Sequence, residues 1–282
     1  MCQPHLIQQV LSDLNLKKEN VKVRTTPMSA SRILHGHPKS ERFDQSFNYR
    51  SIIGNLGYLD KGIRSDISYA PHQCTRFAAY PLKEHGESII WLGRYIHTTM
   101  DKGMIYTPKK SQGLQVYIDA NFTGNWTRDE IDNVDTARYR QGYIITYSGC
   151  PICWKSPFQV GISLSTTKAD YCALLHALKE EIPMIEMFKE MGRNKIKMVT
   201  MNPRIYCEFY EDNSGALAIA KEHKYRPRTK HLNIKLHHFQ QYVNNNEIDI
   251  LPINTDDQPT DVFTKPLAEP LLIKHRKIIM GW

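Results

Sequence analysis

Long apolar runs are missing from this sequence, and none approaches the ~20 residues that a membrane-spanning helix needs. This absence excludes an integral membrane protein. The N-terminal segment has no basic stretch followed by an apolar core, so it does not form a secretory signal. Cysteine is scarce, with six residues among 282, and without a signal these cysteines indicate reduced thiols. We therefore expect an intracellular protein, cytoplasmic or nuclear, without a membrane partner.

Acidic residues are outnumbered by basic ones: 29 Asp and Glu stand against 37 Lys and Arg, which leaves a net charge of +8. This surplus favours a polyanionic partner. Hydrophobic residues make up 41% of the chain and aromatic residues 10%, enough for a sizeable core and too much for global disorder. The length of 282 residues allows one large domain or two modest ones.

The first third of the chain has the periodicity of short helices. Apolar residues recur at helical spacing over 4–16, whereas 17–46 is polar, lacks periodicity and is expected to form a loop. Helical patterns return between 49 and 98, with Pro71 and Pro81 dividing them into several short helices. We therefore expect a mostly helical region over residues 1–110.

After residue 103 the pattern changes to short β-rich runs that alternate with helices. Strands are expected over 113–119, 141–147, 150–155 with a second arm at 160–164, 204–210 and 248–253. Helices are expected over 166–191, 214–222, 231–244 and 260–279. This order predicts an α/β fold, a mixed sheet flanked by helices, over residues 111–282.

Four acidic residues lie where ligand sites form in such sheets, namely at strand ends and helix starts. They are Asp119, Asp170, Asp212 and Asp261. Taken singly, each is explained by a helix cap, a first-turn acid or a strand-ending turn. Helix capping gives no reason for Asp119 to follow the apolar run before it. Carboxylates that converge would repel one another unless a cation neutralised them, and hard oxygen ligands suit Mg²⁺ or Mn²⁺.

Eight stretches stand in a characteristic order from about residue 48 onward: YRSIIGNLGYL, RSDISYA, YIDANFTG, CPICWKS, LSTTKADY, EDNSGALAIAK, RTKHLNIKLHHF and DVFTKPL. Together they resemble the end of a copia-type retrotransposon polyprotein, where the reverse transcriptase is followed by its ribonuclease H domain. Residues 4–16 resemble the segment that follows the polymerase palm in that family.

The resemblance implies a ribonuclease-H-like mixed five-stranded sheet over 111–282, preceded by a helical remnant of the reverse transcriptase thumb and connection region over 1–110. It places the acidic tetrad of the family on Asp119, Asp170, Asp212 and Asp261. The implied activity is cleavage of the RNA strand of an RNA–DNA hybrid by two Mg²⁺ or Mn²⁺ ions. No paired-Asp hairpin of the polymerase kind is present, so DNA synthesis is not expected.

The sequence departs from the family pattern near the tetrad. The family motif, of the form STTEAEY, has Glu where this chain has Asp170, and acids stand at the positions of Lys168 and Asn121. The Asp side chain is shorter by one C–C bond, ~1.5 Å. This predicts weak hydrolysis with Mg²⁺, partial rescue by Mn²⁺ and a gain on Asp170→Glu. The alternative is a decayed or repurposed fragment that binds nucleic acid without cutting it.

A basic stretch follows the third acidic position of the tetrad. The resemblance favours contacts with the hybrid backbone by Lys224, Arg226, Arg228, Lys230, His231 and Lys235. An ordinary solvated helix entry explains the same pattern equally well.

Cys150 and Cys153 form a CxxC, but in a strand they point to opposite faces, so packing is favoured over zinc. Met1 would fall inside the reading frame of such an element, which predicts a truncated product whose partners include the other polyprotein products.

Overall fold

The computed structural model describes residues 1–16, 21–32, 34–36, 40–121, 138–159, 161–163, 165–196, 207–221 and 241–282. The described residues form two compact units. The helical unit comprises 1–106 and 261–282, and the sheet unit comprises 107–121 and the described part of 138–260. The domain boundary expected at residue 110 stays a prediction. The helical unit differs from that expectation by including the C-terminal segment 261–282.

The helical unit consists of short helices separated by the prolines and polar segments that the sequence contains. They are α1 (Pro4–Asp13), α2 (Tyr49–Ile63), the 3₁₀ turn η1 (Ser65–Ile67), α3 (Tyr69–Thr75), α4 (Lys83–Thr98), α8 (Asp261–Thr264) and α9 (Glu269–Met280). The helical patterns expected in this part of the chain are confirmed, with ends that differ by a few residues. α9 ends at Gly281, whose φ of 84° favours glycine.

The sequence explains α2 locally. The side chain of Asn48 accepts a hydrogen bond from the Ser51 backbone N–H at 3.1 Å and caps the first turn. Ile52, Leu56, Leu59 and Ile63 then recur at three- and four-residue intervals and are buried. This apolar stripe is the surface that the helix packs into the core of the unit.

A buried ion pair joins the C-terminal segment to the other helices of this unit. The Arg64 guanidinium donates two hydrogen bonds of 2.8 Å to Asp66, and both side chains are buried. The hydroxyl of Tyr95 on α4 donates to Asp66 at 2.6 Å and accepts from Arg276 on α9 at 3.1 Å. These charge-assisted bonds are one of the links between α9 and the other helices of the unit.

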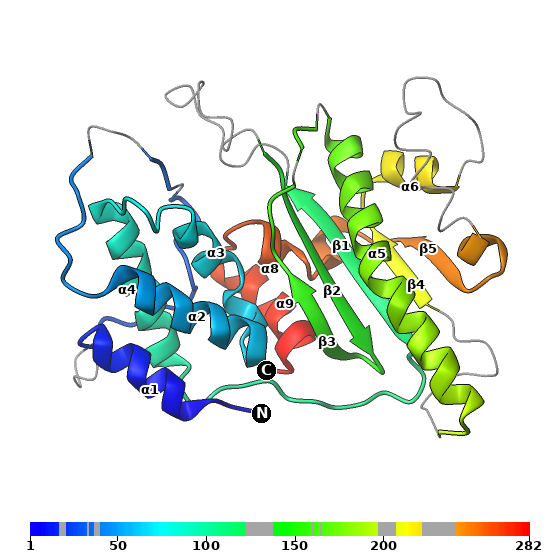
Figure 1. The fold of residues 1–282 in the computed structure, drawn as a ribbon, viewed down its shortest axis with the longest axis horizontal. Helices are drawn as coiled ribbons and strands as arrows, with labels where there is room; N and C mark the ends of the chain where they lie inside the picture. Colours follow the sequence, from blue (N-terminus) through cyan, green and yellow to red (C-terminus); the bar gives the residue numbers. More distant parts are fainter. Residues whose placement is uncertain are drawn as a thin grey trace. The chain divides into compact units, whose positions relative to one another are not determined.

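The sheet unit contains a mixed five-stranded sheet with the order β3-β2-β1-β4-β5 (Figure 1). Its strands are β1 (Leu114–Asn121), β2 (Arg140–Tyr147), β3 (Cys150–Lys155), β4 (Cys207–Glu211) and β5 (Ile248–Pro252). β1, β2 and β3 pair antiparallel, whereas β1 with β4 and β4 with β5 pair parallel. The expected mixed sheet flanked by helices is therefore confirmed. The expected second arm of β3 is wrong where it can be checked, because residues 161–163 are not in a strand.

Two helices lie against the sheet within its own unit. The long helix α5 (Thr166–Arg193) runs across β1, and the short helix α6 (Ser214–Lys221) follows β4 (Figure 1). α5 begins at Ser165, whose side chain accepts from the Lys168 N–H at 3.3 Å. β1 is buried on both faces, as a central strand requires, and its Val116 and Ile118 pack into the same core as Leu174 of α5.

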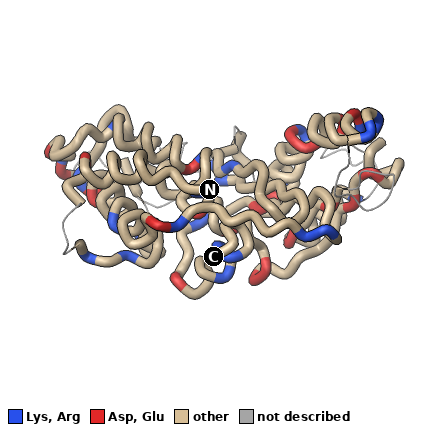
Figure 2. The backbone as a smooth tube through the Cα atoms, turned by 90° about the horizontal axis from the view of Figure 1, so that it is seen from below, with Lys and Arg blue, Asp and Glu red and all other residues tan. Residues whose placement is uncertain are grey.

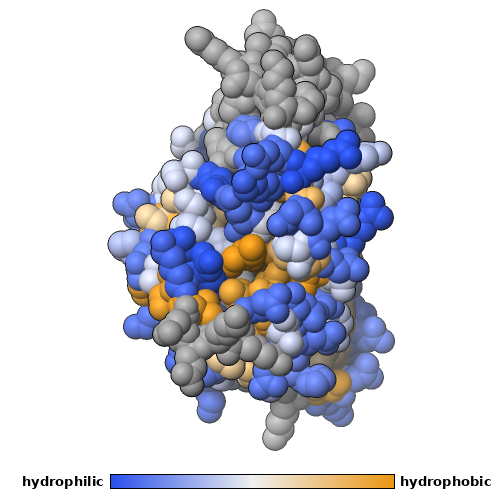
Figure 3. Space-filling model, turned by 90° about the vertical axis from the view of Figure 1, so that its left-hand side faces the viewer, coloured by the Kyte–Doolittle hydropathy of each residue, from blue (hydrophilic) through white to orange (hydrophobic). Residues whose placement is uncertain are grey.

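Charged residues of both signs are interspersed along the described backbone (Figure 2). The side of the molecule on which α4 lies is mostly hydrophilic, with a hydrophobic area near its centre (Figure 3). Throughout the part of the chain that the structure describes, each helix is too short or too polar to cross a bilayer.

Candidate active site

Two of the predicted acidic positions lie just past the paired part of the parallel strands β1 and β4. Tyr117 of β1 is in register with Tyr210 of β4. Asp119 and Asp212 each follow these paired tyrosines by two residues, so they lie beyond the same end of the parallel pair. The carboxyl ends of parallel strands are where α/β sheets gather ligand-binding groups.

Asp170, the fifth residue of α5, connects these two strand ends through both of its carboxylate oxygens. Its Oδ1 accepts from the Ala120 backbone N–H at 3.1 Å, and its Oδ2 accepts from the Asn213 side-chain amide at 2.7 Å. Ala120 follows Asp119 and Asn213 follows Asp212 in the chain. The structure thus brings together three of the four predicted acidic residues within the sheet unit.

The charges of these carboxylates act on one another. Burial is the main cause that raises the pKa of Asp170 to about 7, and the negative charges of Asp119 and Asp212 raise it further. The hydrogen bonds from Asn213 and Ala120 lower this pKa in part. An acid with a raised pKa among other acids is typical of a functional site, although buried networks also produce such shifts.

Glu211 is a further acid that the sequence reasoning did not include. It is the last residue of β4, fully buried, and its Oε1 accepts from the Asn213 backbone N–H at 3.1 Å. Burial raises its pKa to about 9, and the charges of Asp170, Asp212 and Asp119 add to the effect. Glu211 therefore holds its proton more tightly than an ordinary glutamic acid does. Its place before Asp212 in the sequence was the visible signal, but its burial depends on the packing around β4.

Asp261 has a different position from the other three. It is the first residue of α8 in the helical unit, is 2% exposed, and its Oδ1 lies 2.8 Å from the Lys265 ammonium. Its membership of the acidic tetrad stays a prediction. The predicted nucleic-acid contacts at Lys224, Arg226, Arg228, Lys230, His231 and Lys235 lie outside the described residues.

The carboxylates have the chemistry that a hard divalent cation requires, because oxygen ligands and uncompensated negative charge favour Mg²⁺ or Mn²⁺. Among the described residues, however, no three His, Cys, Asp or Glu side chains form a group that is ready to hold a metal ion. The carboxylates therefore fit such a cation in their chemistry, with Asp170 placed next to the residues that follow Asp119 and Asp212.

The two cysteines of the CxxC lie in one strand of the sheet. Cys150 and Cys153 both lie in β3, and none of the six cysteines, all of them described, forms a disulfide. The two residues pair with different positions of β2, Tyr147 and Ile145, across an irregularity in the register. The predicted packing role of these cysteines agrees with their location in the strand.

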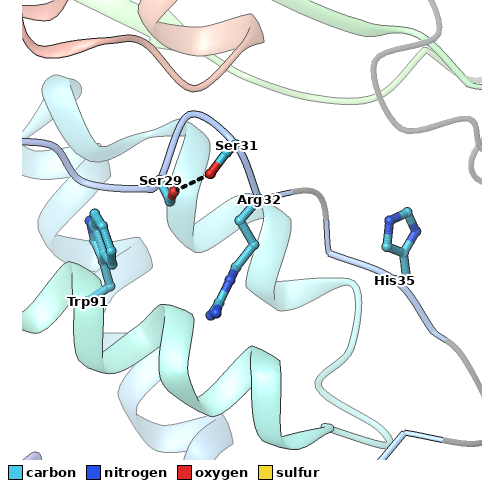
Figure 4. A pocket seen from close by; sticks show the side chains of 5 residues that line it. All are labelled: Ser29, Ser31, Arg32, His35 and Trp91. Atoms are coloured by element: carbon cyan, nitrogen blue, oxygen red, sulfur yellow. Dashed lines mark hydrogen bonds between the residues drawn. The ribbon is translucent and has the colours of Figure 1, made fainter.

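The helical unit contains a cavity of about 420 Å³ (Figure 4). It is lined by Ser29, Ser31, Arg32, His35 and Trp91. The two serine hydroxyls lie 3.1 Å apart in one hydrogen bond, and Arg32 pairs with Glu87 at 3.1 Å. The Arg24 guanidinium lies 3.4 Å from the centre of the Trp91 ring. The polar groups of this cavity thus already have partners within the protein.

Sequence comparison identifies relatives over most of the chain. The retrovirus-related Pol polyprotein from transposon TNT 1-94 of Nicotiana tabacum is 29% identical over 270 residues, which is 94% of this chain and 19% of the relative. The Pol polyprotein from transposon RE1 of Arabidopsis thaliana is 31% identical over 244 residues, 86% of this chain and 15% of the relative. The chain thus spans less than a fifth of the length of either protein. No protein-family model matches the chain.

Structural comparison identifies ribonuclease H proteins. LC11-RNase H1, isolated from compost by a metagenomic approach, superposes with a TM-score of 0.35 and 17% identity, covering 54% of this chain and 92% of the other. The same enzyme in complex with an RNA/DNA hybrid gives a TM-score of 0.33 at 17% identity, over 51% of this chain and 88% of the other. The similarity in sequence to the transposon proteins extends much further along the chain. This protein is a homologue of the retrovirus-related Pol polyproteins of copia-type plant transposons.

Proposed function

We propose that this protein is a metal-dependent endoribonuclease that cleaves the RNA strand of RNA–DNA hybrids. The observation that carries the proposal is the Asp170 carboxylate, which is hydrogen-bonded to the residues following Asp119 and Asp212. Three elements of the sheet unit thereby place three carboxylates together, with a raised pKa at Asp170. The homology to transposon Pol polyproteins supports the same activity.

In this proposal the acidic residues hold two Mg²⁺ or Mn²⁺ ions. The ions would activate the attacking water and stabilise the leaving 3′ oxygen. The protein itself supplies orientation: the backbone of β1 and the side chain of Asn213 each hold one oxygen of Asp170. The raised pKa of the neighbouring Glu211 reduces the negative charge that this residue adds, which limits the repulsion among the carboxylates.

Asp261 completes the proposed set. Gln258 precedes it by three residues and donates from Nε2 to the Ile118 carbonyl at 2.8 Å. Ile118 is the residue directly before Asp119. Asp261 itself is included because the resemblance of the sequence places the fourth acid of the set at this position.

An assay with a labelled RNA–DNA hybrid tests the proposal. We expect cleavage of the RNA strand with Mg²⁺ or Mn²⁺ and none with a chelator. Asp119→Asn should abolish cleavage, because it removes one negative charge from the proposed cation site. Asp101→Asn is the matched control, since Asp101 is exposed and lies in the helical unit. Its activity should equal that of the parent.

Two outcomes would contradict the proposal. Equal cleavage by the parent and by Asp119→Asn would show that the activity does not use this site. Binding of the hybrid without cleavage in either cation would favour the alternative, a fragment that binds nucleic acid but no longer cuts it.

A further inference from the structure

Asn213 makes two sets of hydrogen bonds with opposite ends of its side-chain amide. Its Oδ1 accepts from the backbone N–H groups of Gly215 at 2.9 Å and Ala216 at 3.1 Å. Its Nδ2 donates to Asp170 Oδ2 at 2.7 Å. The side chain therefore caps the start of α6 and at the same time holds a carboxylate on α5.

These partners determine which way the amide faces. Rotating the amide by half a turn would direct its NH₂ group at two N–H donors and its oxygen at a carboxylate oxygen. Both new contacts would be repulsive. The Asn213 side chain therefore presents its NH₂ group, and not its oxygen, to Asp170.

Close packing of the two helix starts limits movement of this side chain. A Cβ added at Gly215 would lie 2.8 Å from the Thr167 Oγ1 of α5 and 3.1 Å from the Asn213 Oδ1. Thr167 Oγ1 itself lies 3.5 Å from Asn213 Oδ1. The start of α6 thus approaches the start of α5 so closely that a Cβ at position 215 would force the Thr167 side chain to shift, and Asn213 lies between them.

We propose that Asn213 is a positioning residue that fixes the orientation of the Asp170 carboxylate toward the cations. This inference rests on the proposed function. Asp170 has a short side chain, and its other oxygen is already held by the backbone N–H of Ala120. The bond from Asn213 removes the remaining rotational freedom of the carboxylate, so that its free lone pairs keep one direction. Residues that orient metal ligands in this way typically affect affinity or activity by about 10–100-fold.

Asn213→Ser separates the two roles of the side chain. Serine caps a helix start about as well as asparagine but is too short to replace the amide donor at Asp170. We expect kcat for hybrid cleavage to fall about 10-fold or more, with KM for the hybrid nearly unchanged. Binding of Mn²⁺ measured by calorimetry should weaken by about 10-fold or more. Asn213→Thr, which also retains a capping hydroxyl, serves as a second variant if the first fails to fold.

Asn48→Ser is the matched control. Asn48 caps α2 in the helical unit with the same kind of side-chain bond, and it is exposed. This substitution should change neither kcat nor Mn²⁺ binding. A loss of the same size in Asn48→Ser would show that capping, and not the position of Asp170, is what the assays detect.

The outcomes distinguish this inference from the proposed function. If the parent cleaves the hybrid and Asn213→Ser retains both its kcat and its Mn²⁺ affinity, the positioning role is wrong while the proposed function stands. If the parent fails to cleave, the proposed function is wrong, and calorimetry decides the inference: weaker Mn²⁺ binding by Asn213→Ser supports it, and equal or absent binding in both proteins overturns it.

Discussion

The thiol of Cys207 in β4 donates a hydrogen bond of 3.4 Å to the Glu181 Oε1 of α5, inside the core of the sheet unit. Both side chains are fully buried. Burial raises the pKa of Glu181 to about 8, and it raises the pKa of the Cys207 thiol as well. Glu181 is therefore largely protonated at neutral pH, and it lies as a neutral acid next to Cys207 of β4.

Glu181 makes the stability of the protein depend on pH. Its pKa is about 8 in the folded protein against 4.5 as the ordinary value, so the folded state binds the proton more tightly. The resulting stability is fully present below about pH 4.5 and is lost as the pH rises through about 8. Glu181→Gln mimics the protonated acid and should remove this loss. We expect the variant to be more stable than the parent at pH 9 but not at pH 5, as measured by urea unfolding.

Glu180→Gln provides the control for this pH experiment. Glu180 is the preceding residue of α5, lies at the surface and pairs with Lys155 at 2.9 Å. Its replacement should shift stability by at most about 1 kcal/mol and leave the pH dependence of the parent in place. If Glu181→Gln followed the same pH curve as the parent, the buried acid would not be the source of the dependence.

Tyr95→Phe tests the buried ion pair of the helical unit. The substitution removes the hydroxyl that donates to Asp66 and accepts from Arg276 while the ring stays in place. Because these bonds involve charged groups, we expect a loss of about 1.5–3 kcal/mol in the free energy of unfolding. Tyr58→Phe, at a residue that is 67% exposed, should cost less than about 0.5 kcal/mol. Equal losses in both variants would contradict a specific role for the Tyr95 hydroxyl.

Two glycines in helices should respond oppositely to alanine. A Cβ on Gly86 of α4 would lie 2.5 Å from the ring of Phe43, which already packs against Phe47 and Tyr49. Gly86→Ala should therefore destabilise the protein by about 1–3 kcal/mol. A Cβ on Gly57 of α2 meets no atom within 4 Å, so Gly57→Ala should stabilise it by about 0.5–1 kcal/mol. Thermal unfolding of both variants measures the difference, and a gain in Gly86→Ala would show that Phe43 moves freely.

The basic stretch after α6 predicts a salt-dependent affinity for hybrids. Each phosphate contact contributes ~0.7–0.9 to the slope of the logarithm of affinity against the logarithm of salt concentration. Replacing Arg228 and Lys230 with alanine should reduce that slope by about 1–2. Replacing Lys61 and Lys102, two exposed lysines of the helical unit, should leave it unchanged. An unchanged slope in Arg228→Ala with Lys230→Ala would identify the stretch as an ordinary solvated surface.

The helices and most of the strands were predictable because their signals are local. The spacing of Ile52, Leu56 and Leu59 predicts α2 from one turn to the next, and Pro81 predicts the break before α4. The order of the strands was not predictable in this way, because it depends on pairs such as Tyr117 with Tyr210 that lie far apart in the chain. The grouping of residues 261–282 with the helical unit likewise depends on distant contacts, such as that of Arg276 with Tyr95.

The candidate site, too, was predictable where its signals are local and not where they depend on distant contacts. The positions of Asp119, Asp170 and Asp212 were predictable from the local pattern, since these acids follow recognisable apolar runs and caps. Tertiary packing was needed to bring Asp170 into hydrogen bonds with the residues after the other two, one of them from the Asn213 amide, and to raise the pKa of Glu211. The physical reason is that burial and the field of neighbouring charges arise only when β1, β4 and α5 pack against one another, whereas helix and strand periodicity is present in each segment alone.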